Sequence, residues 1–135
     1  MLLLPLRLNP GDDLRAALLA ALRAQGHEAA FVLSGIGSLA PACLRLAGAS
    51  EALRIEADTE ILSLAGTLGA GGAHLHASLS DAAGRVVGGH VLEGCRVRTT
   101  AEVLLAVLPG QRFERLHDPA TGCAELIIRT RQDPT

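Results

Sequence analysis

The chain has 135 residues, 49% of them hydrophobic, which is enough for one domain around a single core. Twelve arginines, no lysine and 14 acidic residues give a formal charge of -2, whereas a protein that binds nucleic acid unaided usually carries a basic surplus. The chain contains two phenylalanines, Phe31 and Phe113, and no Trp or Tyr, so it has no aromatic platform on which single-stranded bases could stack. The composition thus excludes a two-domain enzyme and argues against bare DNA as a ligand.

The three cysteines, Cys43, Cys95 and Cys123, form an odd set without a CxxC pair. This pattern argues against a disulfide framework and against a thiolate zinc site, so we expect small buried side chains in a reducing compartment. The apolar run at residues 2–4 is interrupted by Pro5, which leaves it too short for a signal sequence or a membrane span. We therefore expect a cytoplasmic protein that does not enter a membrane.

The first part of the chain predicts a strand, a helix and a second strand. Residues 2–8 are rich in leucine, and the proline among them favours an edge strand because proline cannot donate a ladder hydrogen bond. After a turn, leucines recur at helical spacing from Asp12 or Asp13 to Gly26, which predicts a helix. The apolar segment at residues 29–33 predicts a strand that ends in a tight bend at residues 34–37.

The rest of the chain predicts strands separated by glycine or proline. The segment at residues 100–108 is also compatible with a short helix, because its Ala, Glu and Leu residues favour helices and its apolar run does not alternate cleanly. We expect one domain over residues 1–135, with a frayed polar tail at residues 130–135. The predicted strands lie at residues 42–47, 53–57, 60–67, 73–80, 85–92, 100–108, 112–116 and 125–129.

The stretch from residue 73 to residue 94 predicts a β-hairpin that carries three histidines. Two alanines fit a type I turn, and Gly84 after them fits the left-handed position of a G1 bulge. Continued from this loop, the register places His76 opposite His90, with His74 on the same face. A two-residue loop would move His90 to the other face, so the convergence of the three rings depends on this turn. The reverse face is purely apolar and should contact the core.

Three neutral imidazoles on a rigid hairpin match the ligands of an open zinc or iron site with water in the fourth position. The candidate metal ligands are His74, His76 and His90. A metal-bound water can act as a nucleophile near neutral pH, and Glu93 and Glu102 are the candidate bases, although no spacing argument places either carboxylate near the histidines. The alternative is a hydrogen-bonded histidine patch in a subunit interface.

Other candidate sites are weaker. The glycine-rich residues 66–72 lack both a GK[ST] sequence and a following helix, so we predict a turn rather than a phosphate site. Residues 35–37 lack the third glycine of a dinucleotide fingerprint. No Ser/His/Asp or Cys/His spacing favours a nucleophilic triad, and we expect the isolated His27 and His117 to be solvated. Whether the chain is an enzyme therefore stays open.

The hairpin sequence, residues 74–81 followed by residues 84–90, resembles the signature of the plants-and-prokaryotes conserved (PPC) domain, the domain of plant AT-hook nuclear proteins. The resemblance implies an α+β fold in which one or two helices pack on a mainly antiparallel β-sheet, and assembly as a homotrimer. It also implies a role in transcription regulation, which is that of the plant members. Matching segments at residues 10–14, 34–39, 60–66 and 99–103 extend the resemblance over about residues 5–108.

The chain departs from the plant members in two places. It has no Arg-Gly-Arg-Pro AT-hook, the element that enters the minor groove, so direct DNA binding does not carry over. The plant segment Gly-Arg-Phe-Glu-Ile-Leu, associated with partner binding, corresponds here to residues 57–62, of which only the second half matches. Stand-alone prokaryotic members are commonly labelled DNA-binding because of this kinship, and the resemblance supplies no defined activity for them.

We therefore expect a stand-alone homotrimeric binding module, related to DNA-binding and transcription proteins, that acts through a protein partner. The alternative from another class is a zinc- or iron-dependent small-ligand binder or enzyme that uses the three histidines. A third hypothesis, autonomous DNA binding, requires a basic patch from Arg85, Arg96 and Arg98 and a salt-dependent affinity for duplex. We favour the interpretation of these arginines as ordinary surface residues.

Overall fold

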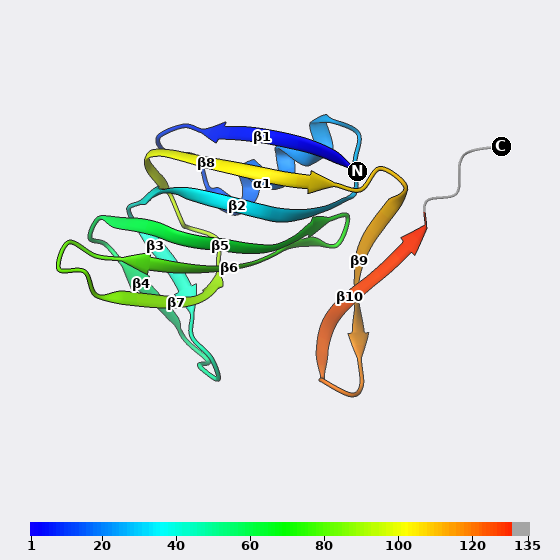
Figure 1. Cartoon of the computed structure of the whole chain (residues 1–135). Coiled ribbons are helices and arrows are strands. Elements are labelled where there is room, and N and C mark those ends of the chain that lie inside the picture. Colours follow the sequence, from blue (N-terminus) through cyan, green and yellow to red (C-terminus); the bar gives the residue numbers. More distant parts are fainter. Residues whose placement is uncertain (131–135) are drawn as a thin grey trace.

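The computed structural model describes residues 1–130, which form one α-helix and ten β-strands (Figure 1). The predicted frayed tail lies outside the described residues except for Thr130, which pairs with Gln111 and is therefore part of a strand. In chain order the elements are β1 (Leu2–Leu8), α1 (Leu14–Ala24), β2 (Ala29–Leu39), β3 (Ala42–Arg45), β4 (Ala52–Ile55), β5 (Thr59–Gly69), β6 (Gly72–Ser80), β7 (Val86–Val91), β8 (Val97–Val107), β9 (Gln111–Asp118) and β10 (Cys123–Thr130).

Eight of these strands form one antiparallel sheet in the order β1-β8-β2-β5-β6-β7-β3-β4, and β9 and β10 form a separate hairpin. β1 lies at the edge of the sheet, as its proline predicted, and Pro5 lies opposite Leu104 of β8. The α+β prediction of a mainly antiparallel sheet with a helix packed on it is thus confirmed.

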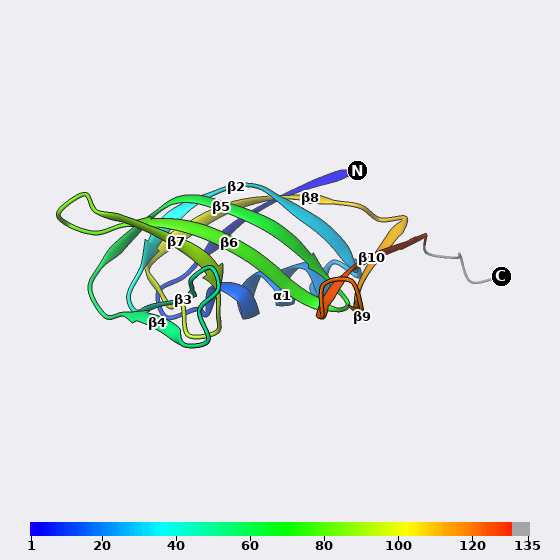
Figure 2. The ribbon, with the colours of Figure 1, turned by 90° about the horizontal axis from the view of Figure 1, so that it is seen from below.

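The helix packs on the concave face of the curved sheet (Figure 2). Its N-cap is Asp13, whose carboxylate accepts a 3.1 Å hydrogen bond from the backbone N–H of Ala16 and so satisfies an otherwise free helix donor. Leu14, Leu18 and Leu22 recur at helical spacing and are fully or almost fully buried. The core therefore lies between α1 and the concave face, and the opposite face of the sheet is left outside it.

The structure corrects one expectation for the strands and decides between two alternatives for another. Residues 34–37 do not bend, because β2 continues through them to Leu39 with two register shifts against β8. The glycines there serve close packing: a Cβ atom on Gly35 would lie 2.9 Å from the Leu64 side chain, and Gly37, at a φ of +148°, would place one 2.5 Å from the Thr100 carbonyl oxygen. Residues 97–107 are a strand, β8, which excludes the helical alternative.

The β9–β10 hairpin packs against one end of the outer face of the sheet. Phe113 is buried and meets Phe31 of β2 edge to face, with ring centroids 5.5 Å apart. The turn predicted at residues 66–72 is shorter than expected, because β5 continues to Gly69 and β6 begins at Gly72, so only residues 70–71 join the two strands. This end of the β5–β6 pair supplies the contact surface, because Cβ atoms on Gly69 and Gly71 would lie 2.5 Å from atoms of Phe113 and Arg115. Glycine at these two positions is thus what allows the hairpin to approach.

The cysteines are free, as expected, but they are not all buried. Cys95 is buried and its thiol donates a 3.2 Å hydrogen bond to the backbone carbonyl of Cys43, whereas Cys123 is exposed on the β9–β10 hairpin. The expectation of three buried side chains was therefore wrong for Cys123, and Cys43 is only partly buried. Among residues 1–130, no helix has the length and hydropathy needed to cross a membrane.

Candidate metal centre

The β6–β7 hairpin has the predicted register. Gly84 adopts a φ of +77°, in the left-handed region that a G1 bulge requires, and its N–H donates a 3.0 Å hydrogen bond to the Asp81 carbonyl. Asp81 and Arg85 then close the loop with a 2.8 Å ion pair. The pairing that follows places His76 opposite His90.

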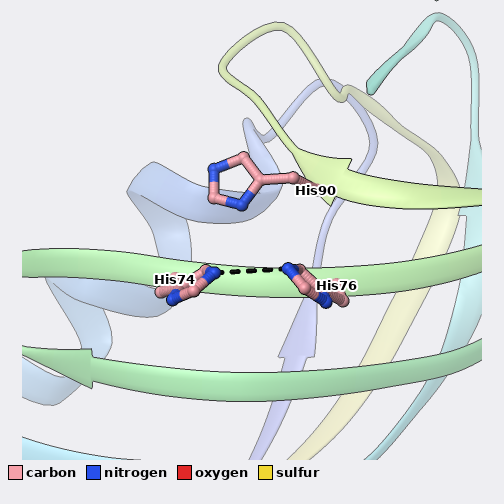
Figure 3. A group of neighbouring side chains, drawn as sticks. All are labelled: His74, His76 and His90. Carbon is pink, nitrogen blue, oxygen red and sulfur yellow. Dashed lines mark hydrogen bonds between the residues drawn. The ribbon is translucent and has the colours of Figure 1, made fainter. Parts of the chain in front are cut away.

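Three histidine side chains converge on the outer face of this hairpin (Figure 3). His74 and His76 come from β6 and His90 from β7, and one ring nitrogen of each lies within 4.8 Å of the others. The Nε2 atoms of His74 and His76 are 3.2 Å apart and share a hydrogen bond. On the reverse face, Leu75 and Val91 are fully buried. The buried reverse face of the hairpin and the turn that joins its strands therefore fix the backbone positions of the three histidines relative to one another.

The surroundings favour neutral imidazoles at two of the three positions. Burial, followed by the charges of neighbouring His74 and of Arg45, lowers the pKa of His90 from 6.5 to about 4. Burial, then the charge of Arg115, lowers the pKa of His74 as well. A neutral imidazole is the form that ligates a metal, so at neutral pH these two rings need lose no proton to do so.

Charged residues from distant strands complete the rim of the site. Arg115 and Glu125, on β9 and β10, line a hollow of about 330 Å³ together with His74. Arg45 of β3 pairs with His90 in the β3–β7 ladder and lines a second hollow of similar size next to it. No local pattern in the sequence marks these three residues as part of the site. Only the packing of β9–β10 on the sheet brings Arg115 and Glu125 to β6.

The two carboxylates considered as catalytic bases do not join the histidines. Glu93 is exposed in the connection after β7 and lies outside the cluster. Glu102 is exposed on β8, which is separated from β6 by β2 and β5, a distance of about 14 Å at the usual strand spacing. The structure therefore gives neither residue a place at this site.

The other two histidines, and the arginines considered as a basic patch, lie outside the three-histidine cluster. His117 is exposed, as expected, but His27 is only half-exposed, and its Nδ1 is buried without a hydrogen-bond partner. Arg85 pairs with Asp81, and Arg98 forms a 2.8 Å ion pair with Asp58. Carboxylates thus neutralise two of the three arginines, which leaves little local surplus of positive charge.

Proteins of several organisms are similar to this chain in sequence or in fold. The chain is 47% identical over 131 residues to the bifunctional protein GlmU of Synechococcus sp. (strain JA-3-3Ab), a match that covers 97% of this chain and 21% of GlmU. The chain thus spans about a fifth of that relative's length. A hypothetical protein from Salmonella has a solved structure that is 37% identical, with a TM-score of 0.92 and coverage of 97% of this chain and 95% of that one.

A further solved structure, described as a metal-containing protein from Archaeoglobus fulgidus, is 28% identical, with a TM-score of 0.81 and coverage of 94% of each chain. Residues 3–109 match the Plants and Prokaryotes Conserved (PCC) domain, the family that the hairpin signature resembles. The match includes the sheet, the helix and the three histidines, and it ends before β9. The chain therefore belongs to the Plants and Prokaryotes Conserved domain family.

Proposed function

We propose that this PCC-type module binds one divalent transition metal ion, zinc or iron, through His74, His76 and His90. The observation that carries the proposal is the convergence of three ring nitrogens within 4.8 Å. In a tetrahedral zinc site, bonds of about 2.0–2.1 Å place ligand atoms about 3.3 Å apart, and the Nε2 atoms of His74 and His76 are 3.2 Å apart. The nitrogen of His90, which lies within 4.8 Å of both, would have to move closer by side-chain rotation to complete the set.

Three properties of the surroundings support a ligand set rather than a histidine patch. The rings project from paired strands, so little conformational entropy is lost when a metal binds. The lowered pKa values of His74 and His90 favour the ligating form. Finally, Gly88 lies beside the cluster and lines the same hollow as His76 and His90, which leaves a path for a further ligand. Three protein ligands and an open fourth position are the arrangement of a site that binds small molecules.

Metal analysis of tag-free protein tests this proposal. Protein stripped with a chelator and incubated with zinc or ferrous iron should retain about one ion per chain after desalting. His90→Ala should lose this ion, and His117→Ala, which removes an exposed histidine on β9, should keep it. Wild-type protein that retains no zinc or iron, or an His90→Ala variant that retains it fully, would refute the metal site.

We also propose that the module assembles as a homotrimer through the outer face of its sheet. The supporting observation is a set of large apolar side chains exposed on neighbouring strands, with Ile36 of β2 and Leu62 of β5 each more than half exposed. Beside Ile36, Pro5 and Leu104 line a hollow of about 650 Å³ across β1, β8 and β2. Exposed apolar surface of this kind marks an interaction site, and further copies of the same chain would cover it.

A role in gene regulation through a protein partner extends this proposal. The family relationship supports it, whereas the paired arginines and the absence of an AT-hook do not favour direct binding to DNA. The partner would contact whatever surface the trimer leaves exposed. Pull-down from an extract with the metal-loaded trimer as bait, and with the His90→Ala protein as comparison, would show whether a partner is recruited and whether recruitment depends on the metal.

A further inference from the structure

The hollow beside the three histidines is bordered by two arginines that form no ion pair within residues 1–130. His74 lines two adjoining hollows, each about 330 Å³ in volume, and Arg115 and Glu125 line both of them. Arg45 lines the one that also contacts His90. Within residues 1–130, neither Arg45 nor Arg115 forms an ion pair with a carboxylate. The rim of the site thus carries two unneutralised guanidinium groups and one carboxylate.

Arg115 is held in place by its neighbours rather than free to leave the site. One of its terminal nitrogens donates a 2.8 Å hydrogen bond to the hydroxyl of Thr67, which lies directly opposite His74 in the β5–β6 ladder. The N–H of Gly71 donates a 3.0 Å hydrogen bond to the carbonyl of Phe113, two residues before Arg115 on β9. The guanidinium is therefore fixed on the histidine side of the sheet, with its other N–H donors available to a ligand.

The same arrangement creates a positive potential where a ligand would bind. The guanidinium groups of Arg45 and Arg115 both line the hollow that His74 and His90 line, so their positive charges lie around the same space. A metal ion on the histidines adds two further positive charges to this potential. An anion that contacts the metal at its open position would also relieve the unpaired charge of the arginines.

We propose that the site takes a small carboxylate, with one oxygen on the metal held by the three histidines and the other accepting hydrogen bonds from Arg115. This inference rests on the metal site proposed above and names the class of its exogenous ligand. With one carboxylate oxygen on the metal, the other is left to accept hydrogen bonds from the guanidinium of Arg115, and such charge-assisted bonds are stronger than those between neutral groups. Glu125 on the same rim repels an anion in proportion to its charge, so it opposes phosphate more than it opposes a monoanionic carboxylate.

The carboxylate subsite depends on the β9–β10 hairpin. Residues 3–109 match the family, whereas Arg115 and Glu125 follow that region. The family region supplies the histidines and Arg45, and the hairpin supplies Arg115 and Glu125, so the choice of ligand can change with the hairpin while the metal site stays the same.

Cobalt substitution tests the inference, because Co²⁺ replaces zinc and its visible spectrum reports each new ligand. Co²⁺-loaded protein in a buffer free of carboxylate and phosphate is titrated with acetate, propionate, acetamide and inorganic phosphate. We expect spectral changes and saturation with the two carboxylates and none with acetamide. Arg115→Gln should weaken acetate binding about tenfold or more, and the matched variant Arg129→Gln, which alters an exposed arginine paired with Glu114, should bind acetate like the wild type.

The outcomes separate the two proposals. If Co²⁺ binds but no carboxylate changes its spectrum, the ligand class is wrong and the metal site stands. Tighter binding of phosphate than of acetate, or equal acetate affinity of Arg115→Gln and wild type, also overturns the assignment. If Co²⁺ itself does not bind, both proposals fail. Circular dichroism of each variant before loading ensures that a loss of binding is not a loss of fold.

Discussion

His76 of β6 lies directly opposite His90 of β7, and this pairing is set by the left-handed backbone of Gly84, eight residues after His76 and six before His90. Each inward step of an antiparallel ladder keeps the register of the loop, so the turn decides which side chains share a face. The chemistry of the site is therefore encoded in a loop that contributes no atom to it.

Replacement of Gly84 by valine should destabilise the hairpin. Its φ of +77° is strained for any residue with a Cβ atom, most of all for a β-branched one, and the expected cost is about 1–2 kcal/mol in the free energy of unfolding. Gly84→Asn should cost less, because asparagine tolerates this region. Urea denaturation monitored by circular dichroism measures both. Equal stability of the valine variant and the wild type would show that the loop is not a G1 bulge in solution.

Charge on the outer face of the sheet should prevent assembly without unfolding the chain. Ile36 is 55% exposed, so Ile36→Glu removes little buried apolar surface in a single chain but places a charge in the proposed interface. Light scattering should give a trimer for the wild type and a smaller species for the variant. Ile128→Glu is the matched control, because Ile128 is 58% exposed on the β9–β10 hairpin. A monomeric wild type at micromolar concentration would refute the homotrimer.

Acid should weaken the contacts of the β9–β10 hairpin through Glu114. This carboxylate accepts hydrogen bonds from Arg129 at 2.7 Å and Arg112 at 2.8 Å, and these bonds, in that order, lower its pKa from 4.5. A folded-state pKa below the unfolded value stabilises the protein above pH 4.5, and this contribution is lost as the pH falls through the folded-state pKa.

The melting temperature of Glu114→Gln should therefore lie below that of the wild type at pH 7, and the two should converge as the pH falls toward 3. Glu93→Gln changes an exposed glutamate in the connection after β7 and serves as the control, with no comparable convergence expected. A difference between Glu114→Gln and wild type that stays constant from pH 7 to pH 3 would contradict the assignment.

Duplex DNA should not bind tightly to the isolated protein. The chain has a formal charge of -2, and Arg85 and Arg98 are paired with Asp81 and Asp58. Electrostatic contact with phosphates is what gives non-specific DNA affinity and its steep salt dependence. Fluorescence anisotropy with a labelled AT-rich duplex should show no saturation at physiological salt. Sequence-selective binding with a strong salt dependence would restore the DNA-binding hypothesis.

The sequence alone determined the helix, the edge strand at the N-terminus and the register of the histidine hairpin. These features depend on local rules: leucines at helical spacing, a proline that cannot donate, and a glycine that turns the chain. The family signature lies in the same local segment, which is why the resemblance and the register agreed. The prediction of a tight bend at residues 34–37 was wrong because it too used a local rule. The glycines there make room for Leu64 and Thr100 of other strands, and a local rule does not detect such contacts.

Only the tertiary structure decided what surrounds the histidines. The contacts that bring Arg115 and Glu125 to His74 join residues about 40 or more positions apart and pass through Gly69, Gly71 and Phe113. No periodicity in the chain encodes such a contact, since it arises from the packing of one hairpin on the end of a sheet. Strand order likewise separated Glu102 from the site. The local sequence thus determined which histidines converge, and the packing decided which charges accompany them.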